Sequence, residues 1–110
     1  MLTFGIDAQA VFSQMNQVRA PAGRLEPVVA ENAPLIVVDY AHTPDALSKV
    51  IGALREAMKA RAGARLWTVF GAGGDRDHGK RPLMGKAADE GSDFIVITTD
   101  NPRSEEPAAI

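Results

Sequence analysis

Three short loops hold most of the side chains that could bind a small polar ligand, and each loop follows a run of apolar residues. The loop at 39–44 reads Asp-Tyr-Ala-His-Thr-Pro, the loop at 71–81 combines glycines with charged residues, and the segment 100–103 reads Asp-Asn-Pro-Arg. Arginine binds carboxylates through a planar pair of N–H donors, while carboxylate and amide oxygens suit an ammonium group. These residue types predict recognition of a small zwitterionic or anionic ligand.

The glycine-rich loop has features of two nucleotide-binding fingerprints but matches neither. A dinucleotide fingerprint has its third glycine where this chain has Arg76. Residues 74–80 have P-loop spacing, but Arg81 follows in place of the Ser or Thr that binds Mg²⁺. Asp75 and Asp77 would also repel a phosphate held there. The loop is either a solvated charged turn or a ligand loop in which Arg76 binds a carboxylate, and its four glycines within nine residues favour the ligand loop.

The segment 100–103 supports two interpretations equally well. Asp100, Asn101 and Arg103 would recognise a zwitterion, with the arginine on a carboxylate and the other two on an ammonium or amide group. The same residues are typical of an Asx-type turn that starts a helix.

The loop at 39–44 contains side chains that could bind a nucleotide. Asp39 would suit a ribose hydroxyl, and His42 stands just before a predicted helix N-terminus, where an anion meets the helix dipole. A single histidine is more often structural, and Arg24, next to a Pro/Gly break, indicates little by itself.

The elements that must position these loops follow from hydrophobic periodicity. Apolar runs at 35–39, 66–70 and 94–98 predict strands, and amphipathic patterns at 44–62 and 82–90 predict the helices between them. Strands that alternate with helices form parallel sheets with right-handed crossovers, and ligands bind at the carboxyl edge of such sheets. An α/β fold with three parallel strands is therefore expected, with all three loops at one edge.

The remaining segments are shorter. We expect a helix over 6–18, a short strand within 25–30 that Pro27 would confine to a sheet edge, and a further helix that begins at Pro107. A domain boundary is expected within 19–33. Three parallel strands make a thin sheet, so the sequence has the character of a piece of a longer protein.

The composition excludes several functional classes. The chain has 110 residues, 45% hydrophobic and 24% charged, with a formal net charge of -2. No global positive charge draws it to nucleic acid or membrane surfaces, and the lack of cysteine excludes disulfides and thiolate metal sites. No apolar run approaches a membrane span, and no signal peptide is evident, so a soluble cytoplasmic protein is expected.

Taken together, the motifs at 39–47, 71–85 and 100–107 resemble those of the Mur ligases, in the same order. The resemblance begins near Arg19 and runs to the last residue. The family has a UDP-binding domain, a central ATPase domain and a C-terminal Rossmann-like domain. It implies that residues 1–24 are the tail of the central domain and that residues 25–110 are the first half of the C-terminal domain.

The resemblance also implies an activity: ATP-dependent amide ligation in peptidoglycan biosynthesis, and hence in cell shape and division, with ATP and Mg²⁺ as cofactors. The Asp-Asn-Pro-Arg form is associated with family members that add meso-diaminopimelate to UDP-N-acetylmuramoyl-L-alanyl-D-glutamate. The residues implied to contact ATP are Arg24, Asp39, Tyr40 and His42. Those implied to bind diaminopimelate are Arg76, Asp100, Asn101 and Arg103.

Other parts of the family's machinery do not occur in these 110 residues: the phosphate loop, the Mg²⁺ ligands and a later Gly-x-Gly-His-Glu segment. We therefore expect no catalytic residue or metal ligand here and no ligation by this polypeptide alone. Two alternatives stay open. Cyanophycin synthetases and folylpolyglutamate synthases share an Asp-x-x-His-Asn-Pro type of motif, and a non-catalytic α/β module could use the same loops to bind a small anion.

Overall fold

The computed structural model describes residue 5 and residues 7–110, which pack as two units, one ending at Asp39 and the other spanning Tyr40–Ile110. The division falls inside the first motif. The family-based domain boundary between residues 24 and 25 stays a prediction, because packing units and family domains need not coincide. None of the described helices is long and apolar enough to cross a membrane.

The first unit contains α1 (Ala8–Gln14), a 3₁₀ turn (Met15–Gln17) and a two-stranded antiparallel sheet of β1 (Glu26–Val28) and β2 (Ile36–Val38). The carboxylate of Asp7 caps α1 by accepting from two backbone N–H groups. The helix expected over 6–18 is shorter than predicted, and its first residue lies outside the described residues. The strand expected within 25–30 is confirmed as β1.

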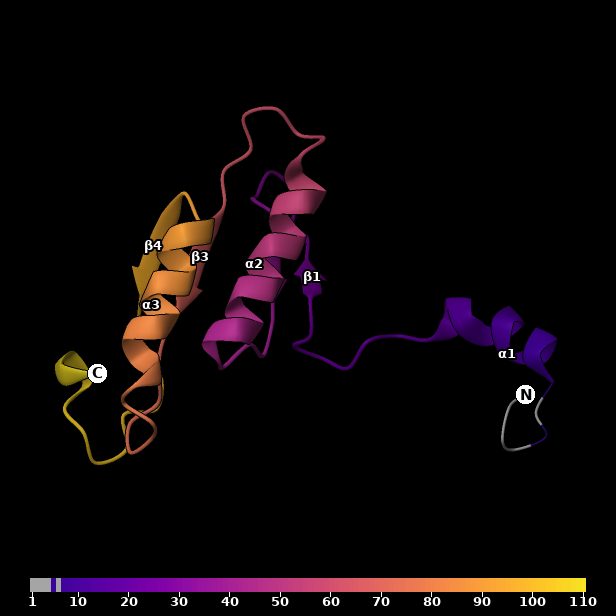
Figure 1. The fold of residues 1–110 in the computed structure, drawn as a ribbon. Helices are drawn as coiled ribbons and strands as arrows, with labels where there is room; N and C mark the ends of the chain where they lie inside the picture. Colours follow the sequence, from indigo (N-terminus) through magenta and orange to yellow (C-terminus); the bar gives the residue numbers. More distant parts are fainter. Residues whose placement is uncertain (1–4, 6) are drawn as a thin grey trace. The chain divides into compact units, whose positions relative to one another are not determined.

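The second unit contains α2 (Pro44–Met58), β3 (Trp67–Phe70), α3 (Lys80–Gly91), β4 (Phe94–Ile97) and a 3₁₀ turn (Pro107–Ala109) in place of the expected helix. β3 and β4 are parallel and in register, α3 is the crossover between them, and α2 packs against α3 (Figure 1). Thr43 caps α2, because its Oγ1 accepts from the N–H of Ala46 at 3.2 Å. α2 ends four residues early, where a turn with Gly63 at φ 78° follows.

The predicted sheet of three parallel strands is observed in part. The run at 35–39 forms β2, which pairs antiparallel with β1 in the first unit, and the parallel sheet described within the second unit contains β3 and β4. Hydrophobic periodicity identifies strands and does not choose their partners.

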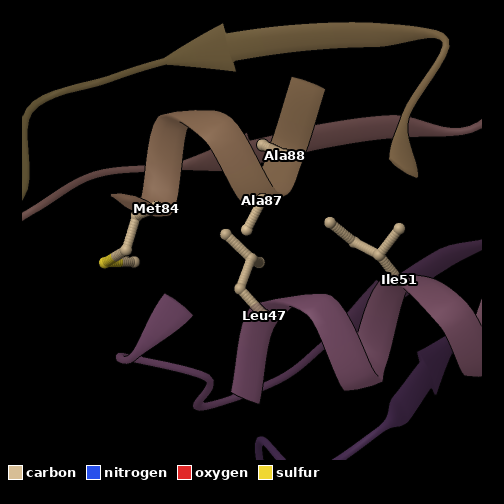
Figure 2. Packing of buried hydrophobic residues seen from close by; sticks show 5 residues of the cluster. All are labelled: Leu47, Ile51, Met84, Ala87 and Ala88. Atoms are coloured by element: carbon tan, nitrogen blue, oxygen red, sulfur yellow. The ribbon is translucent and has the colours of Figure 1, made fainter. Parts of the chain in front are cut away.

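The core of the second unit joins the two helices. Leu47 and Ile51, four residues apart on α2, point toward the buried face of α3 (Figure 2). That face consists of Met84, Ala87 and Ala88, and Ala88 is completely buried. The helices pack closely because Gly91 faces Ile51, where a Cβ would overlap the isoleucine side chain.

Arg55 fixes the start of both strands to this helix pair. Its guanidinium donates to the carbonyl of Gly91 and to the carboxylate of Asp93, each at 2.7 Å. Asp93 in turn accepts from the backbone N–H of Leu66 at 2.6 Å, and the guanidinium of Arg55 holds the pKa of Asp93 below its usual range. With their starts anchored and their register parallel, β3 and β4 end together and deliver the loops that follow them to one place.

Candidate functional site

The loops that follow β3 and β4 touch through their backbones. A Cβ at Gly71 would overlap the carbonyl oxygen of Thr98. A Cβ at the buried Gly74 would overlap the carbonyl oxygen of Pro102 and lie 2.6 Å from its carbonyl carbon. Only glycine allows this approach, which explains why the second loop is rich in glycine. The expected meeting of the loops after these two strands is thus observed.

Arg76 and Arg103, from different loops, both approach the same point beside Gly73. A Cβ at Gly73 would stand 3.9 Å from Arg76 Cγ and 3.2 Å from Arg103 Nη1. The same Nη1 donates a hydrogen bond to the carbonyl oxygen of Gly74, whose N–H donates to the carbonyl of Asn101 at 2.9 Å. The structure therefore brings together the two arginines that the sequence singled out, and one of them also holds the loops together.

Four further side chains join the loops, and we call this set the loop clasp: Asp75, Arg81, Ser104 and Glu105. The carboxylate of Asp75 accepts from Ser104 Oγ at 2.6 Å and from the Ser104 N–H at 3.2 Å. In the reverse direction, Glu105 Oε1 accepts from the Asp75 N–H at 2.5 Å. Each loop therefore supplies a carboxylate that binds the backbone of the other loop.

Glu105 is the most heavily used member of the clasp. Arg81 donates to both of its oxygens, at 2.7 and 2.9 Å, and His78 Nε2 lies 3.2 Å from Oε1. The side chains of Arg81 and Glu105 are 12% and 19% exposed, so water screens this pair less than a surface pair. Hydrogen bonds from Arg81 and from the Asp75 N–H lower the pKa of Glu105 from 4.5 to about 2. In turn, the hydrogen bond between Arg81 and Glu105 raises the pKa of the Arg81 guanidinium.

Two clasp-linked residues have a left-handed backbone. Asp75 and Arg103 have φ of 52° and 51°, a region that residues other than glycine, asparagine and aspartate rarely adopt. Asn101 supports the second of them, because its Oδ1 accepts from the Arg103 N–H at 3.2 Å. The Asx-type turn considered for this segment is therefore present, although no α-helix starts from it.

Asp100 lies beside a cavity of about 300 Å³. The cavity is lined by Arg81 among polar residues and by Phe70 and Ile97 among apolar ones. Asp100 also abuts Gly71, where an added Cβ would lie 3.2 Å from the aspartate Cβ. Asp100 is thus on the same loop pair as the two arginines and lines this cavity.

The four residues that the family resemblance implies for ATP binding fall into two pairs, one in each unit. In the first unit, Asp39 Oδ2 accepts from the backbone N–H of Leu25 at 2.9 Å, next to Arg24 in the chain. In the second unit, the rings of Tyr40 and His42 lie 5.1 Å apart at 54°, and His42 Nδ1 is 3.1 Å from the Tyr40 carbonyl oxygen.

Sequence reasoning missed two kinds of contact. Lys80 Nζ donates to the His42 carbonyl at 3.1 Å and so connects the start of α3 to the loop that precedes α2. Glu105 appeared only as part of a motif, because nothing in its local sequence indicates that it pairs with Arg81, 24 residues away. Among the described residues, no cluster of His, Asp or Glu has the arrangement of a metal site.

Comparison with known proteins identifies the family. The sequence profile of the family "Mur ligase, glutamate ligase domain" matches residues 23–110. Two relatives, from Janthinobacterium sp. (strain Marseille) and Bradyrhizobium diazoefficiens, are both named UDP-N-acetylmuramoyl-L-alanyl-D-glutamate–2,6-diaminopimelate ligase. The first is 51% identical over 110 residues and the second 54% identical over 106, covering 100% and 96% of this chain.

A solved structure of an enzyme with the same name superposes with a TM-score of 0.68 at 44% identity and covers 96% of the chain. In all three comparisons the chain spans 21% of the relative's length. The profile match and these identities show that the chain belongs to the Mur ligase family and contains part of its glutamate ligase domain.

Proposed function

We propose that this chain is part of an ATP-dependent amide ligase that joins meso-diaminopimelate to the D-glutamyl residue of UDP-N-acetylmuramoyl-L-alanyl-D-glutamate. The observation that carries the proposal is the approach of Arg76 and Arg103 to the same point beside Gly73, where two loops meet. The names of the relatives support the choice of substrate.

The reaction requires an activated carboxylate and a positioned amine. ATP phosphorylates the D-glutamyl γ-carboxylate, and an amine of diaminopimelate then attacks the acyl carbon. The new C–N bond forms as the C–O bond to phosphate breaks, phosphate leaves and the nitrogen loses a proton. The role of this chain is to hold the amino acid, because correct placement of the attacking group supplies much of the rate of such reactions.

Diaminopimelate has two carboxylates and two ammonium groups, and the loop pair has groups for both. We assign the carboxylates to Arg76 and Arg103, since each guanidinium can donate two parallel hydrogen bonds. Arg103 uses one Nη1 donor in its hydrogen bond to the Gly74 carbonyl oxygen, and its other N–H donors can bind a ligand. Asp100 and Asn101 are assigned to an ammonium or amide group.

The loop at 39–44 is proposed to bind ATP with Arg24. The chemistry of these residues fits the group: the carboxylate of Asp39, which accepts from the Leu25 N–H, is the kind of acceptor that suits a ribose hydroxyl. The ring of Tyr40 is 65% exposed beside His42, which suits contact with a nucleotide. Mg²⁺ is expected to accompany ATP, and we assign no ligand to it in this chain.

The test of the proposal is substrate discrimination by Arg103→Ala in the complete ligase that contains this segment. Diaminopimelate differs from lysine by a carboxylate, and a site that selects it needs a cation that lysine leaves uncompensated. A charge-assisted hydrogen bond contributes about 1.5–3 kcal/mol, so kcat/KM for diaminopimelate should fall roughly 10- to 100-fold. Use of lysine should fall less.

The matched control is Arg61→Ala, which removes an exposed arginine from the turn after α2 and should leave kcat/KM for both amino acids unchanged. Equal losses for diaminopimelate and lysine with Arg103→Ala would show that Arg103 serves only to hold Gly74 and the loops. Absence of ATP-dependent product from the wild-type ligase would reject the proposed activity itself.

A further inference from the structure

We propose that Glu105 is a positioning residue that sets the separation and direction of the two arginines, Arg76 and Arg103, by locking their loops together. The inference rests on the proposed function only in identifying what the arginines bind. The locking itself is a property of the loop clasp and can be measured without catalysis.

The first argument is that Glu105 connects to three parts of the other loop. Its carboxylate accepts hydrogen bonds from the backbone N–H of Asp75 and from the guanidinium of Arg81. The same carboxylate lies beside the ring of His78. Arg81 belongs to the first turn of α3, and its Nη2 also lies 3.5 Å from the Gly73 carbonyl oxygen. Glu105 therefore ties the glycine-rich loop to the helix that packs against the core.

The second argument is that the contacts of Glu105 reach the backbone beside each arginine. Asp75, which donates to Glu105, immediately precedes Arg76 and has a left-handed φ of 52°. Glu105 follows Arg103 by two residues, and its own N–H donates to the Pro102 carbonyl at 3.0 Å, closing a turn around Arg103. Because Arg103 also has a left-handed φ, of 51°, this turn holds a backbone that an arginine does not adopt readily.

The third argument concerns charge. The site combines three arginines, and among the described residues Glu105 forms its arginine ion pair with Arg81, whose side chain is 12% exposed. This pairing neutralises Arg81, whose guanidinium could otherwise compete for a ligand carboxylate. Arg76 and Arg103 keep their charge for the ligand.

The experiment compares Glu105→Gln with Glu106→Gln in the complete ligase. Glutamine keeps the shape of the side chain but loses the charge and one acceptor oxygen. Glu106 is an exposed neighbour whose side chain makes no cap hydrogen bond, so it is a matched control for the same chemical change. We expect Glu105→Gln to raise KM for diaminopimelate about tenfold or more, with KM for ATP and for the UDP-linked substrate within about twofold of wild type.

A double variant separates positioning from general stability. If Glu105 acts through Arg76 and Arg103, then Glu105→Gln should raise KM for diaminopimelate by a smaller factor when Arg103 is already alanine than it does in the wild-type ligase. Additive effects, or equal increases in KM for all three substrates, would overturn the proposal.

Hydrogen exchange of the same proteins tests the clasp without any reaction. Amides within 72–77 and 101–105 should exchange about tenfold faster in Glu105→Gln than in wild type or Glu106→Gln. Unchanged exchange would overturn the proposal even if activity fell. If the wild-type ligase used no amino acid while exchange still responded to Glu105→Gln, the proposed function would fail, and with it the assignment of Glu105 to ligand positioning.

Discussion

Replacement of Gly74 by alanine tests whether the contact between the two loops is needed for the site. The added Cβ would overlap the Pro102 carbonyl oxygen and lie 2.6 Å from the carbonyl carbon, whereas two carbon atoms in contact lie about 3.5 Å apart, so the loops must separate by at least about 1 Å. That separation breaks the 2.9 Å bond from the Gly74 N–H to Asn101 and the bond from Arg103 to the Gly74 carbonyl. One neutral and one charge-assisted hydrogen bond together contribute about 2–4 kcal/mol.

The expected functional result is a loss of about 100-fold in kcat/KM for diaminopimelate, because a displacement of about 1 Å at a positioning group has effects of that size. The assay is steady-state ligation by the complete enzyme. Gly52→Ala is the control: a Cβ there meets nothing within 4 Å, and alanine should stabilise α2 by about 1 kcal/mol. Wild-type kcat/KM in Gly74→Ala would refute the reasoning, since the loops would then tolerate separation without loss of binding.

Two further predictions concern acidity and the isolated chain. Because the pKa of Glu105 is lowered to about 2 from an ordinary 4.5, its stabilising contribution is complete above pH 4.5 and is lost as the pH falls toward 2; amide exchange in 101–105, corrected for intrinsic pH effects, should accelerate over that interval in wild type and not in Glu105→Gln. The purified 110-residue chain should form no amide product from ATP, diaminopimelate and the UDP-linked dipeptide, because its sequence contains no phosphate loop; product that depends on ATP would contradict this expectation.

The elements that local pattern determines were predictable from sequence. The apolar stripe containing Leu47 and Ile51 predicted α2, and the runs at 66–70 and 94–98 predicted β3 and β4, because periodicity records which face is buried. The pairing of β2 was not predictable in the same way, since a strand's pattern does not specify which neighbour it hydrogen-bonds.

The candidate site was predictable in position and only in part in detail. Arg76 and Arg103 were expected on neighbouring loops because parallel strands end at one edge. The role of Glu105 was not, because it depends on a pairing with Arg81 across 24 residues and on the left-handed turn at Arg103. Asn101 had two equally supported interpretations, and the structure shows its oxygen bound to the Arg103 N–H.

The separation in sequence between the clasp partners has a consequence for folding. Asp75 and Glu105 are 30 residues apart, and Arg81 and Glu105 are 24 apart, with α3 and β4 between them. Loop-closure entropy opposes these contacts until the crossover helix has formed and β4 has paired with β3. The two loops that the clasp joins are therefore expected to be among the last parts of the chain to order during folding. Local opening of β4 would release them before the helix pair of α2 and α3 separates, so the site can be lost while most of the core remains intact.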